Sequence, residues 1–139
     1  MREIKFRAWD KINKKMVHHD DANFIDMVVR FDGVVWCHDS YFGITSENFE
    51  LMQYTGLLDK NGVEVYEGDI LQMVGKVRQP RWEVVWYENG WQMKLVWIKG
   101  HLPERYYVKL SSDKVVEFDE VVGNRYENPV LLTTVKEEA

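Results

Sequence analysis

The sequence predicts a mainly β protein, in which a small antiparallel SH3-like barrel follows an N-terminal β-hairpin region and helices are few or absent. Three dipeptides that favour tight hairpin turns, Asp32-Gly33, Asn61-Gly62 and Asn89-Gly90, each lie between apolar or alternating segments. Aromatic residues make up 14% of the chain, and large rings supply much buried area per residue. Short strands joined by tight turns in a chain of this size favour a small barrel.

Hairpins are predicted in order along the chain. At the N-terminus, residues 4–9 alternate between apolar and charged side chains, residues 10–15 form a polar turn, and Met16 and Val17 begin a return strand. Residues 24–31 and 34–37 form a second hairpin around Asp32-Gly33. Residues 52–57 and 63–66 form a third around Asn61-Gly62.

The clearest hairpin spans residues 82–97. With Asn89-Gly90 as a two-residue turn, Trp86 is expected opposite Met93, Val84 opposite Leu95, and Trp82 opposite Trp97. These six side chains share one apolar face, which predicts burial, whereas the other face is mixed. A slip of one residue would scramble the two faces, which supports the separation.

Helix signals are weak, and residues 47–52 and 103–110 are the candidates for short helices. A boundary is expected near residues 50–60. The predicted regions are an N-terminal β-hairpin region at 1–50, an SH3-like barrel region at 51–132 and a flexible tail at 133–139, with one combined domain as the alternative.

Composition and charge restrict the function classes. The net charge is -5, and neither half of the chain is basic, so a gross electrostatic footprint for nucleic acid is lacking. The single cysteine, Cys37, excludes an internal disulfide and disfavours a cysteine-based zinc cluster. The N-terminus lacks the apolar run of a signal peptide, and no apolar stretch approaches the roughly 20 residues of a membrane span. A cytoplasmic protein without a membrane partner is therefore expected.

Three segments of the sequence are MREIKFRAWD at 1–10, LMQYTGL through DKNG to YEGDI at 51–70, and VGNRYENP at 122–129. Together they resemble the YopX family of small phage and prophage proteins. The segments keep the family's order and lie at both ends and the middle of the chain. Arg125 departs from the pattern, because that position is commonly apolar in the family.

The resemblance implies a phage or prophage origin and a mainly β fold with an SH3-like barrel. It brings no activity, cofactor or catalytic residue, and no cofactor is expected. The motif residues have structural interpretations, because Gly, Asn and Asp serve bends and turns, and Asp69 is expected to bond to nearby backbone. The motif residues are Gln53, Tyr54, Thr55, Gly56, Gly62, Tyr66, Glu67, Gly68, Asp69, Gly123, Asn124, Tyr126, Glu127 and Asn128.

No arrangement of residues in the sequence predicts catalysis, so a non-enzymatic protein is expected. Serines lack an elbow motif, and a Gly-rich phosphate loop is absent. Nothing in the sequence indicates a carboxyl group with a raised pKa. A composite metal site from His18, Asp20 and His38 requires their strands to pair, and a solvated turn is the alternative interpretation. A metal-dependent enzyme is accordingly the third hypothesis.

Two binding hypotheses rank above the metal-dependent enzyme. The first is a protein-interaction module whose partner is a host or phage protein or a second copy, because aromatics are abundant and the charge is acidic. The second is nucleic-acid binding through a basic loop and exposed aromatics. The surface proposed for binding comprises Lys76, Arg78, Arg81, Tyr87 and Trp91.

Overall fold

A computed structural model of the chain describes residues 3–18, 27–29, 31–32, 35–39, 43–44, 48–73, 79–100, 105–110 and 119–132. The chain divides into two compact units between Gln53 and Tyr54. The predicted three-part division of the chain stays a prediction. The described strands confirm a mainly β protein, and the one helical element among them is a 3-10 turn, η1 (Pro129–Leu132).

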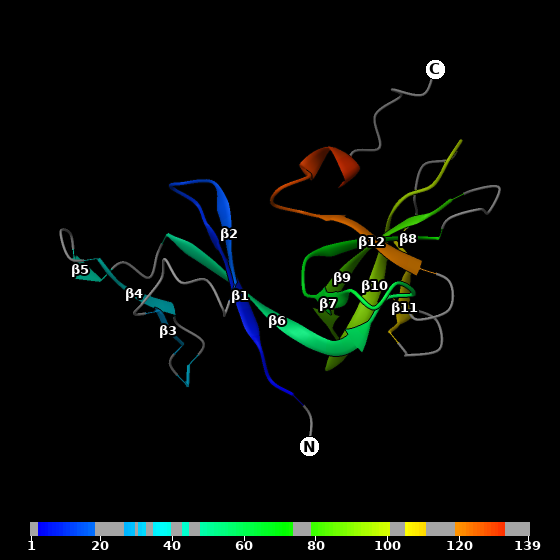
Figure 1. The fold of residues 1–139 in the computed structure, drawn as a ribbon. Helices are drawn as coiled ribbons and strands as arrows, with labels where there is room; N and C mark the ends of the chain where they lie inside the picture. The colour runs from blue at the N-terminus through cyan, green and yellow to red at the C-terminus, as the bar shows by residue number, and fades with distance from the viewer. Residues whose placement is uncertain are drawn as a thin grey trace. The chain divides into compact units, whose positions relative to one another are not determined.

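The first unit consists of short antiparallel hairpins (Figure 1). Its strands are β1 (Phe6–Asp10), β2 (Lys15–His18), β3 (Met27–Val29), β4 (Val35–Asp39), β5 (Gly43–Ile44) and the first half of β6 (Phe49–Leu58). The predicted hairpins at the N-terminus and around Asp32-Gly33 are confirmed, because β1 pairs with β2 and β3 pairs with β4. The helix considered at 47–52 is wrong, because this segment enters β6, whose side chains alternate between two faces.

β1 lies between β2 and β6 in its sheet, and residues on both of its faces are buried. Ala8 packs on one face, and Arg7 and Trp9 lie on the other, all with little exposed surface. Asp10 ends the strand and caps the turn that follows, where its Oδ1 accepts hydrogen bonds from the backbone N–H groups of Ile12 and Asn13. In the polar turn predicted at 10–15, the side chain of Asp10 therefore accepts the hydrogen bonds of backbone N–H groups that have no strand partner.

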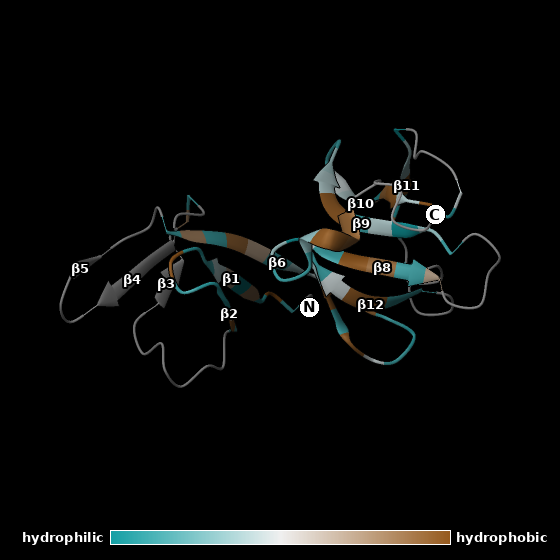
Figure 2. Cartoon of the chain, turned by 90° about the horizontal axis from the view of Figure 1, so that it is seen from above, coloured by the Kyte–Doolittle hydropathy of each residue, from teal (hydrophilic) through white to brown (hydrophobic). Residues whose placement is uncertain are grey.

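The second unit is built on a five-stranded antiparallel sheet. After β6 come β7 (Glu64–Tyr66), β8 (Asp69–Met73), β9 (Arg81–Tyr87), β10 (Gly90–Trp97), β11 (Tyr107–Lys109) and β12 (Asp119–Asn124). The sheet order is β11-β10-β9-β8-β12, and β6 pairs with β7 as the Asn61-Gly62 turn predicts. Figure 2 shows hydrophobic and hydrophilic residues interspersed along β6 and β8, as expected for strands with one buried face.

The core of the second unit is a cluster of Val65, Leu71, Val84 and Met93. It brings β7, β8, β9 and β10 together, and partly buried side chains from β6, β11 and β12 surround it. The sheet curls into a half-barrel, but β11 and β12 are its two edges and do not pair in the described part of the chain. A closed SH3-like barrel is therefore not observed. The helix considered at 103–110 is also wrong, because β11 occupies 107–109.

The hairpin of β9 and β10 turns one residue earlier than predicted. Glu88 and Asn89 both have positive φ, 49° and 63°, which is typical of the two central residues of a type I′ turn. Trp86 consequently pairs with Trp91 instead of Met93, and Val84 pairs with Met93. Up to Leu95 the displacement is of two residues, an even number, so the pairing changes while each side chain keeps its face. A bulge between Leu95 and Trp97 then places Trp97 opposite Arg81, so the predicted pairing of Trp82 with Trp97 is wrong.

The backbone of β12 lies very close to the segment that follows it. A Cβ atom added at Gly123 would lie 2.5 Å from the side-chain oxygen of Asn128 and 2.9 Å from Leu131 Cδ1. Glycine therefore lets η1 fold back against β12, and the bulge between Val121 and Gly123 lies at the same point. Gly68 is required for a different reason: its φ is 86°, a backbone conformation that glycine adopts readily and that is strained for other residues.

Candidate functional site

Among the described residues of the surface predicted for binding, Arg81 lies apart from Tyr87 and Trp91. Lys76 and Arg78 lie outside the described residues. Arg81 and Tyr87 are the first and last residues of β9, about 20 Å apart at the usual rise per residue. The guanidinium of Arg81 lies 4.2 Å from the ring centroid of Trp97, so it packs on the protein's own aromatic ring.

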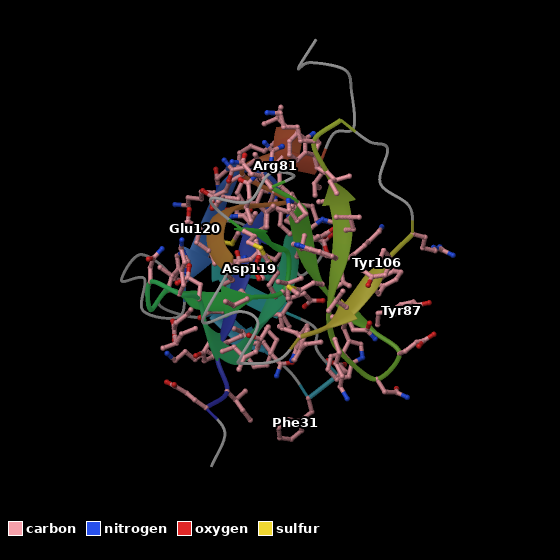
Figure 3. All side chains as sticks on the ribbon, turned by 90° about the vertical axis from the view of Figure 1, so that its right-hand side faces the viewer. Phe31, Arg81, Tyr87, Tyr106, Asp119 and Glu120 are labelled. Carbon is pink, nitrogen blue, oxygen red and sulfur yellow. The ribbon has the colours of Figure 1, made fainter. Side chains whose placement is uncertain are left out.

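The exposed aromatics differ from those predicted. Trp86, expected in the core, is 56% exposed, and Trp91, expected on the surface, is half-buried and packs against the core cluster. The two indoles meet edge to face, with centroids 4.9 Å apart. Trp86 is on the core face but is the last residue of that face before the turn, so the cluster does not cover it. Tyr87 is exposed as expected, Tyr106 is also exposed, and Figure 3 shows both side chains extending outward near β11.

The motif residues form two groups, and all of them except Gln53 belong to the second unit. The first group consists of four residues on β6 (Gln53, Tyr54, Thr55 and Gly56), Gly62 in the β6–β7 turn, and Tyr66, Glu67, Gly68 and Asp69 at the junction of β7 and β8. The second group, Gly123, Asn124, Tyr126, Glu127 and Asn128, covers the end of β12 and the turn after it. The groups meet through the backbone, because the N–H of Arg125 donates to the carbonyl oxygen of Gly68 at 2.9 Å.

Side chains of the first group bond to backbone groups. The Oδ2 atom of Asp69 accepts a 2.7 Å hydrogen bond from the N–H of Tyr66, as the sequence predicts for this residue. The hydroxyl of Thr55 donates to the carbonyl oxygen of Val65 and accepts from the N–H of Leu57. These bonds hold β6, β7 and β8 at the point where β6 bends, so the first motif group organises the start of the half-barrel.

The second group is a turn organised by asparagines. Oδ1 of Asn124 accepts hydrogen bonds from the N–H groups of Tyr126 and Glu127, at 3.0 and 2.8 Å. Asn128 bonds back, because its Oδ1 accepts from the N–H of Asn124. The two amides close the turn that leads from β12 into η1.

Arg125 forms an ion pair with a buried carboxylate. Its Nη1 atom lies 2.9 Å from Oε2 of Glu83, whose residue is 5% exposed. The residue that departs from the family pattern therefore compensates a charge on β9. The sequence held no local signal for this pair, because the partners are 42 residues apart.

A pair of buried aspartates joins β12 to the β6–β7 turn. Asp59 is 2% exposed, and its carboxylate accepts hydrogen bonds from the N–H groups of Asn61, Val63 and Val121, all between 2.8 and 2.9 Å. Asp119 is also 2% exposed, but no group in the described segments donates a hydrogen bond to its Oδ1. Burial raises the pKa of Asp119 from 3.8 to about 6, although the nearby Lys60 ammonium opposes the shift. Nothing in the sequence indicates this raised pKa.

Asp119→Asn is expected to stabilise the protein in a pH-dependent way. Because the pKa of Asp119 is higher in the folded state than in the unfolded state, the folded state binds the extra proton between about pH 4 and 6. The stability that this group contributes is fully present below pH 4 and is lost as pH rises through 6. The quantity to compare is the free energy of unfolding of the variant minus that of the wild type. This difference should be larger at pH 8 than at pH 4 by on the order of 2 kcal/mol.

Urea unfolding of both proteins at pH 4, 6 and 8 measures this difference. Asn61→Asp, which adds rather than removes a carboxylate and lies at the exposed β6–β7 turn, is the control and should not show the same gain at pH 8. A difference between Asp119→Asn and wild type that stays constant over the range would contradict the buried, ionising carboxyl.

The described residues assemble no group of three or more metal-ligating side chains. His18 lies on β2 and is exposed, His38 lies on β4, and Asp20 lies outside the described residues. β2 and β4 belong to different sheets, so strand pairing does not bring these histidines together. In the same described part of the chain, no helix is long and apolar enough to cross a membrane.

Comparisons with known proteins agree on one family. Residues 5–133 match a family model described as YopX protein. Protein EF1440 from Enterococcus faecalis has a similar structure, with a TM-score of 0.61, 26% sequence identity, and coverage of 96% of this chain and 100% of its own. The crystal structure of YopX from Bacillus subtilis matches with a TM-score of 0.58 at 19% identity, with the same coverage. A comparison with curated proteins finds no match.

Proposed function

Because the chain belongs to the YopX family over residues 5–133, we propose that it is a phage or prophage accessory protein that works inside the host cell by binding another protein, without catalysing a reaction. The proposal extends to an SH3-like barrel as the binding scaffold, which the curl of the five-stranded sheet supports. The partner is a host or phage protein, or a second copy of the chain.

The exposed indole of Trp86 carries this proposal. A tryptophan with 56% of its surface exposed is unusual for a side chain of this size, and tryptophan is enriched among residues that dominate binding energy in interfaces. Trp91 supports the ring from the edge, so the indole is held in place before binding. A preorganised aromatic side chain loses little conformational freedom when a partner covers it.

Retrieval of the tagged protein from host cells during phage production, with and without nuclease, tests the proposal. Wild type is compared with Trp86→Ser and with Val130→Ser, which removes an equally exposed apolar side chain from η1. A partner that survives nuclease, is retained by Val130→Ser and is lost with Trp86→Ser would support it. Sedimentation of the purified proteins distinguishes a second copy from a foreign partner.

The proposal fails if no specific protein accompanies the wild type and the purified chain stays monomeric. It also fails for this surface if Trp86→Ser, with an unchanged unfolding transition, keeps every partner of the wild type.

A further inference from the structure

The outer face of β9, β10 and β11 carries a second candidate surface, separate from Trp86. Val84, Met93 and Val108 are cross-strand partners and point into the core. Side chains alternate along a strand, so the residues between them point to the opposite face. The register places Lys94 beside Tyr107, Gln92 beside Lys109, and Tyr87 beside Gly90 on this outer face.

Two tyrosines form a flat platform on the outer face. The rings of Tyr87 and Tyr107 stack with centroids 4.1 Å apart and an interplanar angle of 11°. Tyr87 is 37% exposed (Figure 3). Gly90, its cross-strand partner, leaves open space, because a Cβ built there meets nothing within 4 Å. A planar ligand can therefore approach the stacked pair at the turn end of the sheet.

The charge of this region is opposite to that of the chain. Residues 81–110 contain five basic side chains, Arg81, Lys94, Lys99, Arg105 and Lys109, and three acidic ones, Glu83, Glu88 and Glu104, a balance of +2 against -5 for the whole protein. Glu83 is already paired with Arg125. Within the described residues, neither Lys94 nor Lys109 forms an ion pair. Two ammonium groups on the outer face are thus available to an anion.

We propose that this face binds single-stranded nucleic acid, with a base stacked on the Tyr87–Tyr107 pair and the phosphates contacted by Lys94 and Lys109. Aromatic rings that accept a base and cations that follow the backbone are the two parts of sequence-tolerant single-strand binding. An acidic peptide would satisfy the lysines but would leave the flat tyrosine pair without a matching planar group. The rest of the chain is acidic and repels phosphate groups, so contacts with the nucleic acid are confined to this face.

Fluorescence anisotropy with a labelled oligothymidylate of about 12 nucleotides tests the proposal on the full chain. Binding should weaken as salt rises, and Lys94→Glu and Lys109→Glu should each lower the magnitude of the slope of log K against log salt by about 0.7. Tyr87→Ala should lower affinity about tenfold, and Tyr87→Phe should retain it, because stacking needs the ring and not the hydroxyl.

The control for charge is Lys14→Glu, which changes the net charge equally at an exposed turn of the first unit. Equal loss of binding with Lys14→Glu would overturn the proposal, since the effect would then reflect overall charge. Absence of binding at low salt, unchanged affinity of Tyr87→Ala, or equally strong competition by polyglutamate would also overturn it. Trp86→Ser should leave oligonucleotide binding intact, which separates this surface from the one proposed for a protein partner.

Discussion

Asp59→Ala is expected to lower the free energy of unfolding by about 3 kcal/mol. The carboxylate of Asp59 is 2% exposed and accepts three backbone hydrogen bonds, two within its own turn and one from Val121 on β12. Alanine fills little of the site and leaves three N–H donors without this acceptor. Each buried donor left unsatisfied costs about 1–3 kcal/mol, and partial access to water for the two turn donors reduces the total.

Asp59→Asn separates the two parts of this effect. Its amide oxygen can serve the turn donors at Asn61 and Val63, but its NH₂ group would face the N–H of Val121, where an acceptor is needed. We therefore expect a smaller loss than with alanine. Asn61→Ala removes only an exposed side-chain bond to Glu120 and should change stability by less than about 0.5 kcal/mol. Equal effects of Asp59→Ala and Asn61→Ala in urea unfolding would contradict this account of Asp59.

Leu71→Ala is expected to cost about 3 kcal/mol of unfolding free energy or more. Leu71 is fully buried in the cluster with Val65, Val84 and Met93, at the middle of β8. Removing Cγ and its two methyl groups loses their transfer free energy and leaves a cavity, because hydrogen bonds to β9 and β12 on both sides keep β8 from moving inward.

Tryptophan fluorescence during urea unfolding measures this loss, since four of the six tryptophans lie on β9 and β10. Leu58→Ala is the matched control, because the same side chain is removed from an exposed position at the end of β6. It should change stability by less than about 0.5 kcal/mol. Similar losses for the two leucine variants would show that the cluster around Leu71 is not the core of this sheet.

Local patterns in the sequence were sufficient to predict the hairpins. Asp32-Gly33 and Asn61-Gly62 mark turns where the structure has them, and strand alternation assigns Val84 and Met93 to one buried face. The register of β9 and β10 was wrong, because Glu88 and Asn89 took the two turn positions that the dipeptide signal gives to Asn89 and Gly90. Alternation alone does not distinguish these registers, since both keep the same faces.

The candidate sites were less predictable because they depend on distant pairings. Exposure of Trp86 follows from its position at the end of a face, which periodicity does not encode. The raised pKa of Asp119 needs its burial beside the β6–β7 turn, roughly sixty residues away along the chain. The stacking of Tyr87 on Tyr107 likewise depends on β11 joining the sheet. Contacts of this kind join residues that are distant in the sequence, so they arise only in the assembled sheet and cannot be predicted from any single segment.

The path of β6 has a consequence for proteolysis. Its first half pairs with β1 and its second half pairs with β7, and the boundary between the compact units falls inside this one strand, after Gln53. Proteases cleave most readily where several residues can leave their hydrogen bonds together. On either side of that boundary Gln53 pairs with Phe6 and Tyr54 pairs with Tyr66, so a fragment cut there would begin or end in a broken strand. Two compact units are thus joined by a continuous strand, and a protease has to open a sheet before it can separate them.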